Sequence, residues 1–274
     1  RRRSLVVGWL CRGTLHLVDA DDYWWLHALT GHLPLTASMR RLEQEGVPAR
    51  EVERGVDGIV AALAAEGPLL RTDLRARVAA AGVAAEGQCL PHLLVVASSR
   101  ALVVRGPLVG REQAYVLAAD WLGPAPDLDR DEALVALAVR YVAAHHPATE
   151  RDLAAWSGLP LREVRQGIAG AGARLEAGAG GELRPAAEPD RSGPTAGPAG
   201  PPPPMLLGPF DPVLHGWADR TWVLAEHTSL VTSNGMFRAT LLVGGRAVGT
   251  WRAGGGEVRL EPFEPLTAAA STAL

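Results

Sequence analysis

Apolar positions along this chain recur three or four residues apart in two stretches, and each stretch is followed by short apolar runs. The recurring spacing is typical of amphipathic helices, whereas short apolar runs bounded by glycine or proline indicate strands. The first stretch predicts helices over 49–66, 72–81 and 88–100, then strands over 102–108 and 115–117. The second predicts helices over 132–145, 150–157 and 161–169, then a short ribbon over 174–176 and 182–184.

Both stretches therefore place three helices before a β-hairpin. This is the order of a winged helix, a helix-turn-helix motif completed by a β ribbon. We predict two such units in tandem, over residues 49–122 and 130–184. Helical triplets occur in many folds, so the order of the elements does not by itself identify the unit.

The two ends of the chain follow other patterns. Near the start, strands over 4–10 and 14–18 turn about Arg12-Gly13, and a helix over 19–31 has Asp19 and Asp21 at its beginning. Residues 185–204 are rich in proline and glycine and predict a linker. Beyond it, residues 205–266 predict a small antiparallel β domain with hairpin turns at Asn234-Gly235 and Gly244-Gly245 and strands over 222–226, 229–232, 237–243 and 246–252. The fold class is α+β.

Composition narrows the setting of the protein. The 274 residues are 47% hydrophobic and 21% charged, as in ordinary globular proteins, and no apolar run reaches the roughly 18 residues of a membrane span. The chain opens without a signal-peptide pattern, and its two cysteines, Cys11 and Cys89, are expected to be small buried side chains in a reducing cytoplasm. We predict no membrane partner and a cytoplasmic location.

The overall charge argues against strong non-specific binding of nucleic acid. The net charge is −3 and the pI about 6.3, whereas domains that bind in this way usually have a pI above about 9. Any DNA contact must therefore come from local clusters, such as the first eighteen residues, which hold four arginines and no acid, or Arg71, Arg75 and Arg77 around Asp73. A solvated helix face would show the same pattern.

Motifs for other chemistry are absent from the sequence. It contains no Walker loop, dinucleotide motif or Gly-x-Ser-x-Gly elbow. His27 and His32 lack the spacing and the glutamate of a zinc protease site, so we expect neither a metal nor a cofactor. His145 and His146 precede Pro147 at a helix end, where a cation suits the helix dipole.

Two motifs, in this order and far apart along the chain, carry a family resemblance. The first is Arg12-Gly13-Thr14-Leu15-His16-Leu17, and the second opens on Phe210-Asp211-Pro212, continues through His215-Gly216-Trp217-Ala218-Asp219-Arg220 and closes on residues 244–252. Together they resemble the bacterial winged-helix DNA-binding proteins that include the AlkZ-like, crosslink-repair DNA glycosylases. The resemblance implies tandem winged helices around a concave surface that binds double-stranded DNA. It also implies hydrolysis of the N-glycosidic bond of alkylated or crosslinked purines, and a bacterial, nucleoid-associated location.

The resemblance and the helix-turn-helix geometry point to candidate DNA contacts. Arg12 is expected to contact phosphate and His16 to border the lesion pocket, with a hydrogen bond inside the hairpin as the alternative for His16. Arg162 and Arg165 lie one turn apart on a predicted recognition helix, although Glu163 between them would oppose DNA and a salt-bridged face is the alternative. Three tryptophans, Trp217, Trp222 and Trp251, are expected in the sheet core rather than in base stacking. The full set of expected DNA-binding residues is Arg12, His16, Arg71, Arg75, Arg162, Arg165, Arg220 and Arg246.

The chain also departs from the family pattern. The family's catalytic glutamine–x–glutamine or glutamine–x–aspartate motif lies upstream of the arginine-glycine-threonine hairpin, and none of the four glutamines here has Gln or Asp two residues later. We therefore expect a chain truncated at its N-terminus or diverged, with residues 1–48 the remnant of a first winged helix and no catalytic residue. A transcription regulator without enzymatic activity, or a fragment that does not fold stably, are the alternatives. The sequence shows no heptad seam for a dimer, which favours a monomer.

Overall fold

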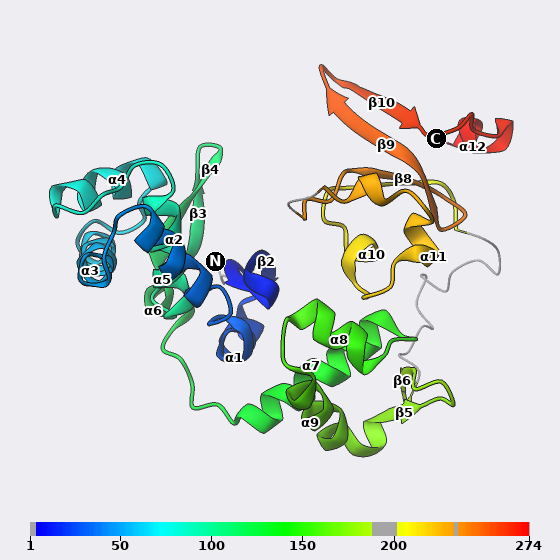
Figure 1. The fold of residues 1–274 in the computed structure, drawn as a ribbon, viewed down its shortest axis with the longest axis horizontal. Helices are drawn as coiled ribbons and strands as arrows, with labels where there is room; N and C mark the ends of the chain where they lie inside the picture. The colour runs from blue at the N-terminus through cyan, green and yellow to red at the C-terminus, as the bar shows by residue number, and fades with distance from the viewer. Residues whose placement is uncertain (1–3, 188–201, 233–234, 274) are drawn as a thin grey trace. The chain divides into compact units, whose positions relative to one another are not determined.

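The computed structural model describes residues 4–187, 202–232 and 235–273 (Figure 1). Helices are combined with antiparallel sheets, so the predicted α+β class is confirmed. The chain forms two compact units that alternate along the sequence. Unit 1 comprises Arg1–Ala138 and Ser157–Gly172, and unit 2 comprises Val139–Trp156 and Ala173–Leu274. No helix in the described parts is long and apolar enough to cross a membrane.

Unit 1 is built on one antiparallel sheet with the strand order β2-β1-β3-β4. Its strands are β1 (Leu5–Leu10), β2 (Thr14–Asp19), β3 (Val103–Val109) and β4 (Glu112–Leu117). The sequence predicted both hairpins, but it did not predict that they share a sheet. The pairing of Val7 with Arg105 joins them and brings the N-terminal hairpin beside strands nearly one hundred residues away.

Residues 20–122 of unit 1 form the helices α1 (Ala20–Thr30), α2 (Leu35–Gln44), α3 (Ala49–Glu66), α4 (Arg71–Ala80), α5 (Cys89–Ser99) and the short α6 (Ala118–Leu122). The apolar faces of α2 to α5 pack into one core. The Asp19 carboxylate accepts a hydrogen bond from the Asp21 amide (2.9 Å), which confirms Asp19 as the helix cap. Helices α2 and α6 were not predicted. Leu42 of α2 is fully buried in the same cluster as Ile59, Leu74 and Leu90.

The second predicted helical triplet is also present. Its elements are α7 (Arg130–His145), α8 (Glu150–Ser157), α9 (Leu161–Ala171) and the paired strands β5 (Leu175–Ala177) and β6 (Leu183–Pro185). The start of α8 is a reciprocal capping box, because the Thr149 amide donates to Asp152 Oδ2 (2.8 Å) and the Asp152 amide donates to Thr149 Oγ1 (3.2 Å). This cap was predicted from the spacing of the two residues.

Unit 2 ends in a second antiparallel sheet with the strand order β10-β9-β8-β7. Its elements are β7 (Met205–Leu207), α10 (Pro212–His215), α11 (Thr221–Leu224), β8 (Thr240–Val243), β9 (Arg246–Gly254), β10 (Glu257–Pro262) and α12 (Ala268–Ala273). The two-residue turn at Gly244-Gly245 is confirmed, with φ of +56° and +80°. Strands β7 and β10 were not predicted. The predicted linker lies mostly outside the described residues, as does Asn234 of the other predicted turn.

Two predicted strands of this region are wrong. Residues 222–226 overlap helix α11, and residues 229–232 begin in a 3-10 turn, Thr228–Leu230. Helix α11 begins where it does because Asp219 Oδ1 accepts hydrogen bonds from the amide and the hydroxyl of Thr221 (2.9 and 2.8 Å). The run Trp222-Val223-Leu224 therefore buries Val223 and Leu224 from a helical turn and leaves Trp222 45% exposed.

Candidate nucleic-acid interface

The tip of the β1–β2 hairpin is held by close backbone packing within unit 1. Arg12 and Gly13 both have left-handed backbones, with φ of +56° and +70°. A Cβ on Gly13 would lie 2.8 Å from Cβ of Pro34, and a Cβ on Gly158 would lie 3.2 Å from the backbone nitrogen of Arg12. The turn therefore needs glycine, and its tip contacts the loop that leads into α9.

His16 is hydrogen-bonded within its own hairpin. Its Nε2 lies 2.9 Å from Thr14 Oγ1 and 3.3 Å from the Cys11 carbonyl, and Thr14 Oγ1 in turn donates to the same carbonyl (3.1 Å). Because Thr14 Oγ1 donates its own proton to the Cys11 carbonyl, these contacts place a proton on Nε2 of His16. They match the structural alternative for His16, and its role at a lesion pocket stays a prediction.

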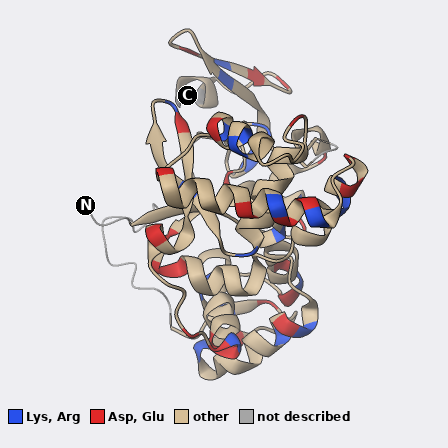
Figure 2. Ribbon diagram, turned by 90° about the vertical axis from the view of Figure 1, so that its left-hand side faces the viewer, with Lys and Arg blue, Asp and Glu red and all other residues tan. Residues whose placement is uncertain are grey.

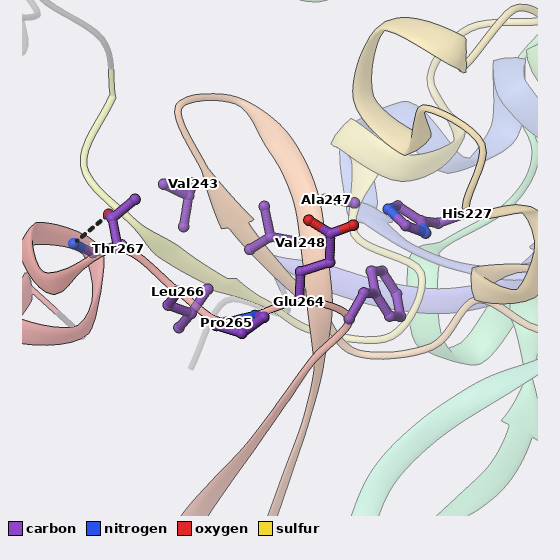
Figure 3. A pocket seen from close by; sticks show the side chains of 10 residues that line it. His227, Val243, Ala247, Val248, Glu264, Pro265, Leu266 and Thr267 are labelled. Carbon is purple, nitrogen blue, oxygen red and sulfur yellow. Dashed lines mark hydrogen bonds between the residues drawn. The ribbon is translucent and has the colours of Figure 1, made fainter.

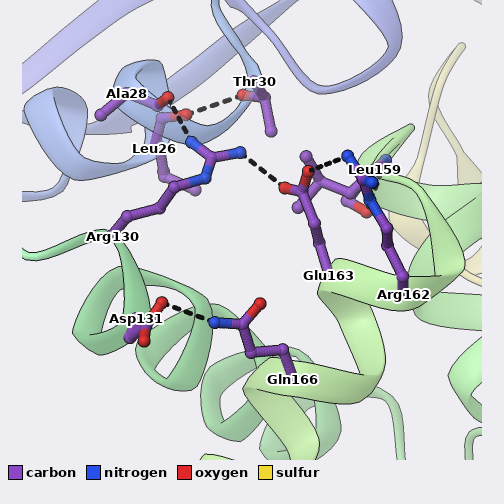
Figure 4. Close-up of polar contacts among 10 residues, drawn as sticks. Leu26, Ala28, Thr30, Arg130, Asp131, Leu159, Arg162, Glu163 and Gln166 are labelled. Atoms are coloured by element: carbon purple, nitrogen blue, oxygen red, sulfur yellow. Dashed lines mark hydrogen bonds and ion pairs between the residues drawn. The ribbon is translucent and has the colours of Figure 1, made fainter.

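Helix α9 presents two exposed arginines, and the acid between them is turned away. The Arg162 side chain is 85% exposed, and Arg165 is also exposed. Glu163 is only 17% exposed, because Arg130 holds its carboxylate at 2.5 Å, whereas Arg162 lies 3.9 Å away (Figure 4). Arg130 also donates to the Ala28 carbonyl (3.1 Å). These ion pairs match the alternative of a salt-bridged face, and the contact of this helix with DNA stays a prediction.

The arginines of α4 differ in their partners. Arg75 pairs with Glu86 at 2.7 Å, and Arg77 forms a two-pronged contact with Glu66. Arg71, at the first position of the helix, is exposed and pairs with no carboxylate in the described residues. Of the two expected contacts on this helix, Arg71 is thus available to an anion, and Arg75 would have to give up an exposed pair.

Arg71 lines a polar hollow of about 370 Å³ in unit 1 that the sequence did not predict. The other lining residues come from the β3–β4 hairpin and are Arg105, Arg111, Glu112, Gln113 and Tyr115. Sequence patterns could not find this group, because Arg71 meets the hairpin only through tertiary pairing. The Leu69 and Tyr115 backbones exchange hydrogen bonds of 3.1 and 2.8 Å, which bring the start of α4 beside β4.

The motif at residues 215–220 clamps a loop onto α7 and α8 within unit 2. The Tyr141 hydroxyl donates to the Gly216 carbonyl (2.6 Å), Trp217 Nε1 donates to the His145 carbonyl (3.0 Å), and the Ala218 amide donates to Asp152 (2.9 Å). A Cβ on Gly216 would lie 2.6 Å from His145 Cδ2, so glycine is required there. Most of the motif that carries the C-terminal resemblance therefore has a structural role.

His145 does not act as the predicted cation at the end of α7. Its ring stacks on Tyr141 with the ring centroids 4.4 Å apart and lies edge-on to Trp217 at 5.1 Å. Burial lowers the pKa of His145, and this outweighs the hydrogen bond from the ring to the Tyr141 carbonyl, which raises it. The neutral ring is favoured, so packing rather than the helix dipole explains this histidine.

The C-terminal arginines and tryptophans of unit 2 have varied surroundings. The Arg220 guanidinium lies over the Phe237 ring, 5.4 Å from its centroid, and Arg246 is exposed beside the Gly244-Gly245 turn. Trp251 ties β9 to β7, as predicted for a sheet residue, through a hydrogen bond from its Nε1 to the Leu207 carbonyl (2.8 Å). The predicted place in the sheet core is wrong for Trp217, which packs on α7, and for the exposed Trp222.

Unit 2 also contains a smaller hollow of about 190 Å³ (Figure 3). His227 stacks on Phe263 at its rim, and Glu264 lies beside them. None of the predicted site residues lines it. In the parts of the chain that the structure describes, no group of three or more His, Cys, Asp or Glu side chains could hold a metal ion.

Charged residues are mixed along the helices, with arginines and acids interspersed (Figure 2). This agrees with the near-neutral composition, so any contact with DNA must come from local groups of arginines. Unit 1 holds Arg12, His16, Arg71, Arg75, Arg162 and Arg165, and unit 2 holds Arg220 and Arg246. Within unit 1, the contact between Gly158 and Arg12 brings the hairpin tip to the turn that precedes Arg162.

Comparisons with known proteins agree with this architecture. A family model described as "DNA glycosylase AlkZ-like" matches residues 1–274. Among solved structures, the chain is similar to Streptomyces sahachiroi DNA glycosylase AlkZ, with 22% sequence identity and a TM-score of 0.75 over 98% of this chain and 76% of that one. A search of curated proteins found no match. At this identity the structural similarity supports the fold alone, whereas the family model covers the whole chain.

Proposed function

The chain belongs to the AlkZ-like DNA glycosylase family, and from this premise we propose that it binds duplex DNA carrying alkylated or crosslinked bases. Membership of the family gives it a function related to DNA glycosylases and to DNA repair. The observation that carries the proposal is the match of the family model over residues 1–274. A bacterial nucleoid location and action as a monomer complete the proposal.

The proposed DNA-binding modules are winged helices. The order α3-α4-α5-β3-β4 supports one such unit over residues 49–122, and the order α7-α8-α9-β5-β6 supports another over 130–184. We assign residues 1–48 to part of a first unit, 185–204 to a linker and 205–266 to an antiparallel domain. In this scheme α9 is a recognition helix, because the third helix of such a unit enters the major groove.

The proposed contacts divide into those to phosphate and those near bases. Arg162 and Arg165 project from the first turns of α9, where a recognition helix meets base edges, and their exposure supports this role. The remaining candidates are assigned to phosphate or to the edge of the lesion site, and they are Arg12, His16, Arg71, Arg75, Arg220 and Arg246. Phosphate contacts fix register and supply most of the affinity without reading sequence.

We further propose that these 274 residues bind DNA without cleaving the N-glycosidic bond. The support is the absence from the sequence of a glutamine followed two residues later by glutamine or aspartate. An N7-alkylated purine is already a good leaving group, so the enzyme's task is to position a water and stabilise a developing positive charge on the sugar. A chain without the groups that do this can bind such DNA but leaves the bond intact.

The test uses a labelled duplex containing one N7-methylguanine and an identical unmodified duplex. We expect both to bind with an affinity that falls steeply with salt, and we expect no abasic sites after long incubation, measured by strand cleavage in alkali. Arg162→Gln and Arg165→Gln should each weaken binding by roughly 10-fold. Abasic sites would overturn the non-catalytic part of the proposal, whereas absence of any binding would overturn the whole. Binding of one sequence only, without regard to the lesion, would favour a transcription regulator.

A further inference from the structure

We propose that the hollow between α4 and the β3–β4 hairpin binds one phosphate of the DNA backbone, held by Arg71, Arg105 and Arg111. This inference rests on the proposed function, because the phosphate is that of a bound duplex. It adds two residues, Arg105 and Arg111, that no sequence motif or family resemblance picked out. It also assigns to the hairpin of residues 103–117 a definite ligand.

The three arginines come together through the fold rather than through the sequence. Arg71 is the first residue of α4, Arg105 lies on β3, and Arg111 lies in the turn between β3 and β4. The paired backbones of Leu69 and Tyr115 hold the start of α4 against β4. All three side chains line one polar hollow of about 370 Å³, and the single carboxylate among its lining residues is Glu112. The hollow therefore carries an excess of two positive charges.

The neighbouring acids are committed elsewhere. Asp73 accepts a hydrogen bond from the Leu70 amide (3.1 Å) at the start of the helix, and Glu66 and Glu86 pair with Arg77 and Arg75. Within the described residues, no carboxylate forms an ion pair with any arginine of the hollow. The other arginines of α4 are paired, so the lack of a partner is a property of this place and not of the helix.

The surroundings of Arg105 indicate most strongly that the hollow accepts an anion. The Arg105 guanidinium lies over the Tyr115 ring, 5.2 Å from the centroid, and its buried Nε has no hydrogen-bond partner among the residues that the structure describes. A ring face compensates a guanidinium only weakly, and a buried donor without an acceptor is unfavourable. A phosphate oxygen in the hollow would supply that acceptor, and the planar guanidinium suits it because it can donate two parallel hydrogen bonds.

The chemistry of the hollow favours a phosphodiester over a base. Arginine is the residue that grips phosphate with several donors, and Gln113 offers a further amide. The only aromatic ring in the lining, Tyr115, is 5% exposed and already covered by Arg105, so it offers no free face on which a base could stack. Binding here should consequently be independent of DNA sequence.

The experiment measures how binding of an unmodified duplex depends on salt, by fluorescence anisotropy between 50 and 200 mM. The variants are Arg71→Gln, Arg111→Gln and the double variant Arg71→Gln/Arg111→Gln. Losing one phosphate contact should make the negative slope of log K, the association constant, against log salt less steep by about 0.9. The fall in affinity over this range then becomes about 3.5-fold smaller. If the arginines share one phosphate, the slope of the double variant should be close to that of either single variant.

The matched control is Arg77→Gln on the same helix. It removes the same charge from an exposed side chain that is occupied by Glu66, so we expect the wild-type slope. Arg111 lies in an exposed turn, and its variant therefore tests the hollow without disturbing the core. Far-ultraviolet circular dichroism checks that each variant is folded.

Failure of this inference can be told apart from failure of the proposed function. If the wild type does not bind the duplex, both are overturned. If the wild type binds but the hollow variants keep the slope of Arg77→Gln, the hollow alone is overturned. A parallel titration adds inorganic phosphate at constant ionic strength and measures its binding to the wild type and the variants by isothermal titration calorimetry. Phosphate binding that the variants abolish, together with unchanged DNA binding, would assign the hollow to free phosphate and overturn the proposal.

Discussion

Replacing Tyr141 by phenylalanine isolates one hydrogen bond of the clamp that holds residues 216–218 on α7 and α8. Tyr141 is 3% exposed, and its hydroxyl donates to the Gly216 carbonyl at 2.6 Å. Phenylalanine keeps the ring and its stacking on His145 but removes the donor. Because Gly216 is buried, its carbonyl loses a partner that water cannot readily replace.

A buried acceptor left without its donor costs about 1–3 kcal/mol, and we expect the free energy of unfolding of unit 2 to fall by that amount. Urea denaturation followed by tryptophan fluorescence reports on this region, since Trp156 lies 5.5 Å from the Tyr141 ring. The midpoint should fall with an unchanged m-value. Hydrogen exchange of the Trp217 and Ala218 amides should accelerate in parallel.

The matched control is Tyr23→Phe in unit 1. Tyr23 is also fully buried, but its hydroxyl has no hydrogen-bond partner, so its removal should leave stability unchanged or raise it slightly. The argument is refuted if Tyr141→Phe unfolds at the wild-type urea concentration. It is equally refuted if both variants lose the same free energy, because the loss would then come from the ring environment and not from the clamp.

Three further predictions concern the turns, the histidines and the cysteines. Gly13→Ala should destabilise unit 1 by more than Gly110→Ala in urea denaturation. Both alanines would have to adopt a positive φ, which costs about 1–2 kcal/mol, but only the alanine at position 13 would place its Cβ 2.8 Å from another side chain. Equal losses of stability would contradict the packing argument. Burial lowers the pKa of His27, His92 and His145 below 6.5, so the unfolded chain binds more protons than the folded chain as the pH falls through that value. The free energy of unfolding should therefore decrease from pH 7.5 to 5.5, and it should decrease less steeply in His145→Phe. An unchanged slope in that variant would show that His145 does not contribute. Burial raises the pKa of Cys11 to about 11, and it also raises the pKa of Cys89. A thiol reagent at pH 7.5 should therefore modify neither cysteine until denaturant is added. Rapid labelling of the folded chain would contradict their burial.

Much of the helical framework could be predicted from the sequence because local signals agree with the burial pattern. Val52, Val56, Ile59 and Leu63 recur at helical spacing and are all buried in the structure. The Thr149–Asp152 cap and the Gly244-Gly245 turn depend only on neighbouring residues, so they too could be predicted. Local chemistry of this kind does not need to know the tertiary fold.

The errors arose where a short apolar run has two interpretations. Trp222-Val223-Leu224 fits a strand or one helical turn, and the turn in which Asp219 accepts hydrogen bonds from Thr221 was not taken into account. Helix α2 was missed although Leu35, Ser38 and Leu42 follow helical spacing after Pro34. Strand β10 was missed as well, although Val258 and Leu260 alternate with polar residues after a glycine turn.

The candidate sites could be predicted only in part. Exposure of Arg71 and Arg162 follows from their places on amphipathic helices. The pairing of Glu163 with Arg130, and the meeting of Arg71 with Arg105 and Arg111, depend on contacts between distant segments. No spacing in the sequence encodes those contacts, so charge patterns alone could not identify the partner of Glu163 and missed the hollow.

Because the two units alternate along the chain, a single cut in the sequence cannot separate them. Residues 139–156 share a unit with 173–274, and the ring of Tyr141 is covered by a loop that lies beyond the proline-rich segment. A truncation at that segment would uncover aromatic surface on α7 and α8, and the shortened product should aggregate. The C-terminal region should therefore not fold as a self-contained domain in another protein unless residues 139–156 are transferred with it.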